Sequence, residues 1–130
     1  MPRIKSIEVR LDVADVRRSA QFYAAILGFE VGTLWPEESP QLAILRRDCL
    51  RLQLGKSESA SPAAHRPTST LWLDVEEVEE WHSQIRKDVN IEWGPEVYWY
   101  GRRELGFRDP DRHLIIVSEV TGDPPTCEDH

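Results

Sequence analysis

A six-residue pattern recurs at a distance of about sixty residues, and this repeat constrains the fold more than any other feature of the chain. Residues 11–16 read LDVADV, and residues 73–78 read LDVEEV. The pair Arg47-Asp48 recurs at nearly the same offset as Arg108-Asp109. Such repetition predicts two copies of one supersecondary unit. Neither copy alone would bury both its sheet and its helix well, so we expect the two to pair within one chain or across a dimer.

The first copy predicts a strand, a helix and three further strands. Apolar and charged residues alternate over residues 7–13, which is typical of a half-buried strand. Asp15 is a favourable helix N-cap, apolar residues follow at helical spacing, and Gly28 supplies a left-handed stop. Further strands are expected over residues 29–35, 42–45 and 50–54.

The second copy repeats the order βαβββ. A strand over residues 70–75 precedes a helix over residues 78–87. The remaining extended segments are expected at residues 89–93, 97–100, 103–107 and 113–117, with a bend at Gly94-Pro95 and a turn over residues 109–112.

These patterns predict an α+β fold of two βαβββ modules. We expect one domain over residues 1–119, with modules at about residues 4–55 and 68–119. Residues 56–67 are rich in Ser, Ala and Pro, which predicts a linker. Residues 120–130 hold two prolines and three acidic residues and are expected to be a flexible tail.

Charge and cysteine content narrow the range of partners. Sixteen basic and 23 acidic residues give a net charge of -7, which disfavours nucleic acid and anionic membrane surfaces and favours a cationic small molecule. No apolar run has the length of a signal peptide or a membrane span. Cys49 and Cys127 stand in no metal-binding spacing, and no structural disulfide is expected. A cytoplasmic location fits these features.

Three motifs resemble one known family. The first is VADVRRSAQFY at residues 13–23, followed by Leu27-Gly28-Phe29; the second is YGRREL at residues 100–105; the third is FRDPDRH at residues 107–113. Together they resemble the glyoxalase, bleomycin-resistance and dioxygenase superfamily (the vicinal oxygen chelate superfamily), and most of all its bleomycin-resistance-like members. The family resemblance implies that the two modules form cupped mixed sheets. Arg112 stands where the family usually has glycine, so the turn is expected to close as a type I turn ending in a non-glycine residue.

The resemblance also identifies the positions at which enzymatic members hold a divalent metal. These positions fall on Glu8 and Gln53 in the first half and on Thr70 and Ile116 in the second. Glu8 is a competent ligand, Thr70 is a weak one, and Ile116 has no donor atom. We therefore expect no metal, no other cofactor and no catalytic residue.

Binding of a ligand is expected on the sheet faces that point away from the helices. Strand alternation places Glu8, Arg10, Arg51, Gln53, Thr70, Trp72, Leu114 and Ile116 there. Five tryptophans are many for so short a chain. Trp81 belongs to the apolar stripe of its helix, whereas Trp35, Trp72, Trp93 and Trp99 could meet a ligand or fill an interface between halves or subunits. The predicted ligand-binding residues are Trp35, Trp72, Tyr98, Trp99, Tyr100, Glu104, Glu8 and Asp12.

The resemblance implies a metal-free homodimer that sequesters a planar, cationic small molecule, as in antibiotic resistance. Aromatic stacking and carboxylates that meet cations are the interactions this task requires. Two alternatives remain. One is a metal-dependent lyase, isomerase or thiol transferase of the same fold that uses Glu8, and the other is a ligand sensor or interaction module.

Overall fold

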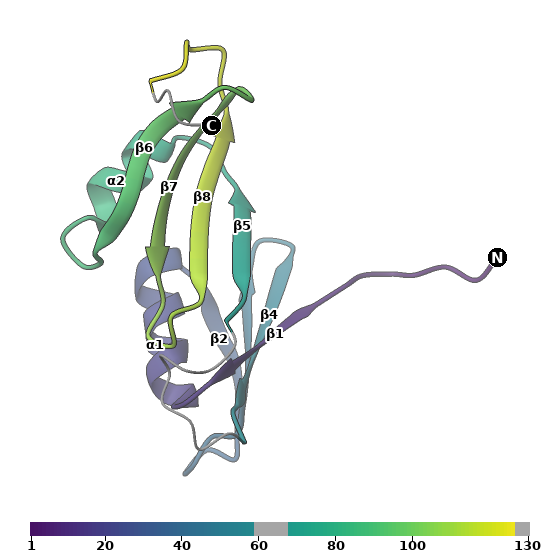
Figure 1. Ribbon diagram of the computed structural model, residues 1–130. Coiled ribbons are helices and arrows are strands. Elements are labelled where there is room, and N and C mark those ends of the chain that lie inside the picture. The colour runs from purple at the N-terminus through teal and green to yellow at the C-terminus, as the bar shows by residue number, and fades with distance from the viewer. Residues whose placement is uncertain (59–67, 127–130) are drawn as a thin grey trace. The chain divides into compact units, whose positions relative to one another are not determined.

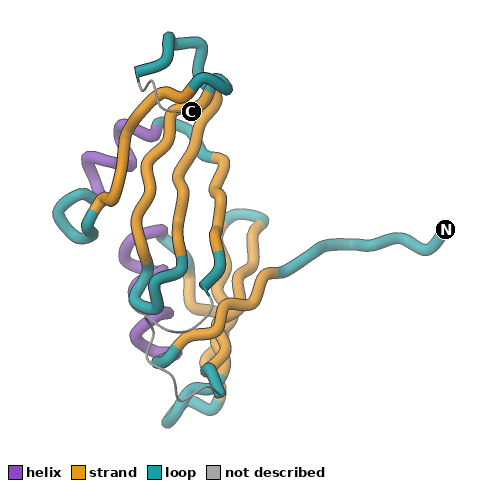
Figure 2. Tube along the Cα trace, viewed as in Figure 1, coloured by secondary structure: helices purple, strands orange, loops and turns teal. Residues whose placement is uncertain are grey.

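The computed structural model describes residues 1–58 and 68–126, and the chain forms two compact units, Met1–Arg66 and Pro67–His130. Within the described residues, each unit holds one helix and one four-stranded sheet. The two units can be followed in Figures 1 and 2. The expected linker lies largely outside the described residues.

The first unit has the order βαβββ. Its sheet runs β1-β4-β3-β2, with β1 parallel to β4 and the other neighbours antiparallel. The elements are β1 (Val9–Val13), α1 (Val16–Leu27), β2 (Glu30–Trp35), β3 (Leu42–Arg47) and β4 (Leu50–Lys56). β4 is two residues longer than predicted and takes in Gly55.

Helix α1 forms where the sequence predicts it. The carboxylate of Asp15 accepts a hydrogen bond of 3.1 Å from the backbone N–H of Arg18, and Gly28 ends the helix at φ 72°. Arg47 Nη1 donates to the Leu27 carbonyl over 2.5 Å, which satisfies one of the last helix carbonyls. The buried helix residues recur every three or four positions: Val16, Ala20, Tyr23 and Leu27.

Residues 1–8 extend from β1 as an arm. The predicted strand was expected to begin at Ile7, but it begins at Val9. Figure 1 shows the arm leaving the sheet of its own unit, with Ile4 87% and Ile7 91% exposed. The alternation continues into the arm without a neighbouring strand to pair with, which explains the later start.

The second unit repeats this topology and confirms the α+β fold of two βαβββ modules. Its sheet runs β5-β8-β7-β6, with β5 parallel to β8. The elements are β5 (Thr70–Asp74), α2 (Val78–Ile85), β6 (Ile91–Tyr98), β7 (Arg102–Arg108) and β8 (Leu114–Val120).

Helix α2 is capped by a residue distant in sequence. Both oxygens of Glu119 accept backbone hydrogen bonds, from Glu77 over 3.0 Å and from Val78 over 3.1 Å. A carboxylate at this end also complements the helix dipole. The helix ends at Ile85, two residues earlier than predicted.

The predicted bend at Gly94-Pro95 is wrong, because β6 runs through it. The register with β7 shifts between Trp93 and Glu96, so the glycine and the proline are absorbed as an irregularity in a continuous strand. Gly94 has φ 82°, and a Cβ atom there would lie 2.2 Å from the carbonyl oxygen of Glu104. Only glycine fits this position.

The turn before β8 follows the expected geometry. The backbone N–H of Arg112 donates to the Asp109 carbonyl over 3.0 Å, and Arg112 adopts φ 70°. Arginine thus takes the left-handed conformation for which the usual glycine is suited. The Asp109 carboxylate accepts from the backbone N–H groups of Asp111 and His113, both over 2.9 Å.

The chain after β8 folds back over the edge of the sheet. β8 reaches Val120, one residue into the expected tail. Thr126 then bonds to the edge strand β6: its N–H donates to the Val97 carbonyl over 2.9 Å, and its hydroxyl accepts from the Val97 N–H over 2.8 Å. Residues 127–130 lie outside the described residues.

Among the helices of residues 1–58 and 68–126, none is long and apolar enough to span a membrane.

Candidate functional site

In the second unit, the sheet face that points away from α2 carries a row of side chains across all four strands. Register places Trp72 beside Ile116, Ile116 beside Gly106, and Gly106 beside Trp93. Paired residues share one face of a sheet. A Cβ atom at Gly106 would lie only 2.4 Å from Cε2 of Trp93, so the indole ring covers the backbone of this glycine. Trp72, by contrast, is 53% exposed.

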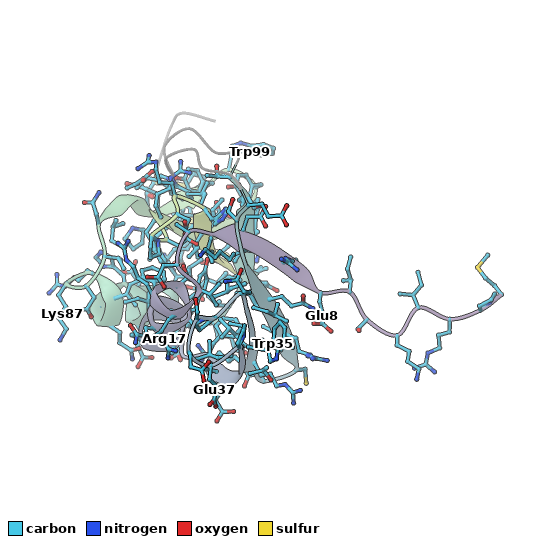
Figure 3. The ribbon with its side chains drawn as sticks, turned by 90° about the horizontal axis from the view of Figure 1, so that it is seen from below. Glu8, Arg17, Trp35, Glu37, Lys87 and Trp99 are labelled. Carbon is cyan, nitrogen blue, oxygen red and sulfur yellow. The ribbon has the colours of Figure 1, made fainter. Side chains whose placement is uncertain are left out.

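The aromatic surface continues from Trp93 along the end of β6. The rings of Trp93 and Tyr98 meet edge to face at 6.0 Å, and Tyr98 stacks on Tyr100 at 5.7 Å with an angle of 6° between the planes. Trp99 meets Tyr100 edge to face at 5.4 Å and is 67% exposed. Figure 3 shows the labelled Trp99 side chain projecting from the ribbon. The rings therefore hold one another in place and leave open surface.

Glu104 lies beneath this surface as a buried carboxylate. Its side chain is 2% exposed and accepts from the Tyr100 hydroxyl over 2.5 Å and from the Ser118 hydroxyl over 2.8 Å. Ser118 in turn accepts from Arg102 Nε over 2.6 Å, and Arg102 also pairs with Asp74. The network links β5, β8 and β7 and fixes the orientation of the Tyr100 ring.

The Tyr100 hydroxyl is held in its protonated form. Partial burial, the hydrogen bond to Glu104 and the negative charge of that carboxylate raise the pKa of Tyr100 well above the ordinary value of 10.0. A phenol in this state is a poor general base at neutral pH. Tyr100 is therefore suited to packing and stacking, and it has no proton-accepting role at neutral pH.

The predicted residues of the first unit lie on the corresponding face of its own sheet. Glu8 accepts from Gln53 Nε2 over 3.1 Å and pairs with Arg51 at 3.3 Å. Figure 3 shows Glu8 where the N-terminal arm joins β1. Trp35, at the end of β2, is 64% exposed, and Asp12 is exposed on β1.

Among the described residues, no histidine side chain lies on the open face of either sheet. His113 is 3% exposed, and its Nδ1 accepts from the Ser69 N–H over 2.8 Å. This agrees with strand alternation, which turns His113 toward the helix side with Ile115. His82 lies on α2. His65 and His130 fall outside the described residues.

Three residues of the second unit's site, Arg102, Gly106 and Ser118, were not predicted as site residues. Trp93 was named only among the tryptophans that could meet a ligand or fill an interface. A signal was present in Gly106, because an isolated glycine within a strand marks the close approach of another group.

A family comparison identifies the fold. The model of the Glyoxalase/Bleomycin resistance protein/Dioxygenase superfamily matches residues 3–117. The chain belongs to this superfamily. Among curated proteins, YraH of Bacillus subtilis is 24% identical to this chain over 127 residues. The match covers 90% of this chain and 99% of YraH.

Solved structures of the same fold have diverse names. A lactoylglutathione lyase of Agrobacterium tumefaciens is 19% identical with a TM-score of 0.72, covering 92% of this chain and 96% of its own. TioX of Micromonospora sp. ML1 is 18% identical with a TM-score of 0.75, covering 88% of this chain and 97% of its own. Identities this low establish the fold and leave the activity open.

The four positions that the resemblance predicts for metal ligands carry a poor donor set in this chain. In the first unit, Glu8 is engaged by Gln53 and Arg51. In the second, Thr70 offers one hydroxyl and Ile116 offers no donor atom. Among the residues that the structure describes, no group of three His, Cys, Asp or Glu side chains could hold a metal ion. These residues do not fit the centre of metal-dependent superfamily members.

The first unit also has an unpredicted open cavity of about 440 Å³ at the start of α1. It is lined by Asp15, Arg17 and Arg18 of the helix start, by residues 38–40 and by Lys56. Arg17 donates to the Glu37 carbonyl across this region, and Figure 3 labels both residues. The cavity lies at the helix start, whereas the predicted ligand residues of this unit lie on the sheet.

Proposed function

We propose that this chain is a metal-free binding protein of the bleomycin-resistance-like type, which sequesters a planar, cationic small molecule on the aromatic sheet face of the second unit. The observation that supports it is the open indole of Trp72 on the same face as the interlocked rings of Trp93, Tyr98 and Tyr100. The first unit's Trp35, Glu8 and Asp12 are not needed for this proposal.

Binding requires less from this surface than catalysis would. The polar groups beneath the rings satisfy one another: Glu104 accepts from two hydroxyls, and Arg102 bonds to Ser118 and Asp74. A rigid aromatic platform loses little entropy when a flat ligand stacks on it. Open indole faces also attract cations through their quadrupole, and the net charge of -7 has the sign that draws cations in.

A metal-dependent lyase, isomerase or thiol transferase is the competing function. It would require a complete donor set, and Ile116 supplies no donor at one of the four positions. The fold shared with a lactoylglutathione lyase does not favour this function for the present chain, because one fold hosts many activities.

The test is titration of the purified protein with bleomycin and with proflavine, followed by tryptophan fluorescence and calorimetry. We expect quenching, and we expect Trp72→Ala to weaken binding about fivefold to tenfold, because one stacking surface is worth roughly 1 kcal/mol or more. Added salt should weaken binding without abolishing it, since stacking survives screening.

Trp81→Phe is the matched control, because Trp81 lies on α2 and away from this face. It should leave the affinity unchanged. If neither cation binds at high micromolar concentration, the sequestration proposal fails for flat cations. If both bind and Trp72→Ala is neutral, the ligand occupies another surface.

A further inference from the structure

One cation on the sheet face of the first unit has no partner among the residues that the structure describes. Arg10 is exposed on β1 and lies between Glu8 and Asp12 in the alternation of that strand. Glu8 does not pair with it, because the Glu8 carboxylate is bound by Arg51 at 3.3 Å and by Gln53 at 3.1 Å. The other carboxylate of this strand face, Asp12, is paired by register with Gly55.

The guanidinium is held against the backbone at a glycine. A Cβ atom at Gly55 would lie 2.2 Å from Nη2, 2.3 Å from Nε and 2.4 Å from Cζ of Arg10, so the side chain fills the space that any other residue would occupy. Arg10 remains exposed, and a guanidinium presents paired N–H donors that match the two oxygens of a carboxylate.

The same row of the sheet continues into apolar surface. Register pairs Gly55 with Leu42 on β3, and Leu42 with Trp35 on β2. These residues share one face, with Trp35 64% exposed. Two strand spacings separate Gly55 from Trp35, about 10 Å. A fused two-ring acid is of a size to reach from the guanidinium to the indole.

We propose that Arg10, seated on Gly55, is a subsite for the carboxylate of an aromatic acid whose ring packs on Leu42 and against Trp35. The subsite belongs to the first unit alone and takes an anion, so it is independent of the cation-binding proposal for the second unit. Three arginines and three carboxylates share this face, Arg10, Arg46 and Arg51 with Glu8, Asp12 and Glu30, so it is balanced in charge where the whole chain is acidic.

The probe is 2-naphthoate at pH 7, and its neutral counterpart 2-naphthamide has the same rings. Binding is followed by calorimetry and by the indole N–H signals in ¹H–¹⁵N spectra, with the Trp35 signal assigned from Trp35→Phe. We expect 2-naphthoate to bind about tenfold more tightly than 2-naphthamide. The Trp35 signal should move, and the Trp72 signal should not.

Two variants separate charge from geometry. Arg10→Gln should remove the preference for the acid. Gly55→Ala keeps the charge and places a methyl group where the guanidinium lies, so it should reduce the preference at least threefold while the circular dichroism spectrum is unchanged. The three atoms nearest to the new methyl group all belong to the flexible end of Arg10, and Gly55 has no left-handed φ to lose, so we expect this variant to fold.

Arg46→Gln is the matched control, an exposed arginine on the same face that is not seated on Gly55. This variant should keep at least half of the preference for 2-naphthoate over 2-naphthamide. Equal affinity of the wild-type protein for the acid and the amide would overturn the proposal, and so would equal losses in Arg10→Gln and Arg46→Gln. Failure of bleomycin or proflavine to bind would leave these results unaffected, because those cations report on the second unit.

Discussion

Replacement of Glu104 by alanine tests the buried network that supports the aromatic surface. The carboxylate is 2% exposed and accepts hydrogen bonds from Tyr100 and Ser118. After the change, the Tyr100 hydroxyl can turn to water because this residue is 41% exposed, but Ser118 is 0% exposed and loses the acceptor for its proton. The Tyr100 hydroxyl should therefore regain a hydrogen bond from water, whereas the Ser118 hydroxyl should be left without an acceptor.

The expected loss follows from these two hydrogen bonds. A hydrogen bond to a charged group contributes about 1.5–3 kcal/mol, and an orphaned buried donor costs about 1–3 kcal/mol. The desolvation cost of the carboxylate is recovered at the same time. We expect Glu104→Ala to lower the free energy of unfolding by about 3 kcal/mol. Glu104→Gln should lower it by about half as much, because the amide keeps one acceptor and presents a donor to the other hydroxyl.

Urea unfolding, followed by circular dichroism at pH 7, measures the loss. Glu79→Ala removes the same group from an exposed site on α2, where the side chain is 68% exposed. This control should change the free energy of unfolding by no more than about 0.5 kcal/mol. A double-mutant cycle with Tyr100→Phe should give a coupling of about 1 kcal/mol or more. If Glu104→Ala costs no more than Glu79→Ala, the carboxylate is not buried and bonded as described, and the reasoning fails.

Three further predictions concern pH, metal and assembly. Because the pKa of Tyr100 is raised in the folded chain, its contribution to stability is present below pH 10.0 and is lost as pH rises above that value, so the stability difference between wild type and Tyr100→Phe should shrink in alkaline unfolding experiments. Elemental analysis of protein purified without chelators should find no stoichiometric zinc, nickel or manganese, and chelation should not shift the melting temperature; a near-unit metal content would contradict the proposed function. Light scattering should give a homodimer, since the arm leaves Ile4 and Ile7 exposed and sheet edges remain to be covered; the 15.0 kDa monomer at micromolar concentration would exclude it.

The fold was predictable because local signals and the repeat agreed. Asp15 and Gly28 mark the ends of α1 through capping chemistry that depends on neighbours in sequence. The bend at Gly94-Pro95 was wrong for the opposite reason. Both residues are turn formers in isolation, but pairing with β7 keeps them inside a strand, and no local pattern reports that pairing.

The sequence predicted residues of the candidate site, such as Trp72 and Glu104, but it did not predict how their side chains are arranged. Strand alternation placed Trp72 on the open face, where it is 53% exposed. It could not show that Glu104 is buried, because the cover comes from Tyr100 and Ser118, and the latter is on a strand 14 residues away in sequence. The position of Arg10 over Gly55 likewise depends on the parallel pairing of β1 with β4, which only the folded sheet reveals.

The attachment of Thr126 to β6 has a practical consequence for handling the protein. An uncovered edge strand offers its N–H and C=O groups as a template on which other chains can add and aggregate. Thr126 occupies both backbone groups of Val97 on that edge. Loss of the segment that carries Thr126 would thus expose this edge strand and lower the solubility of the protein.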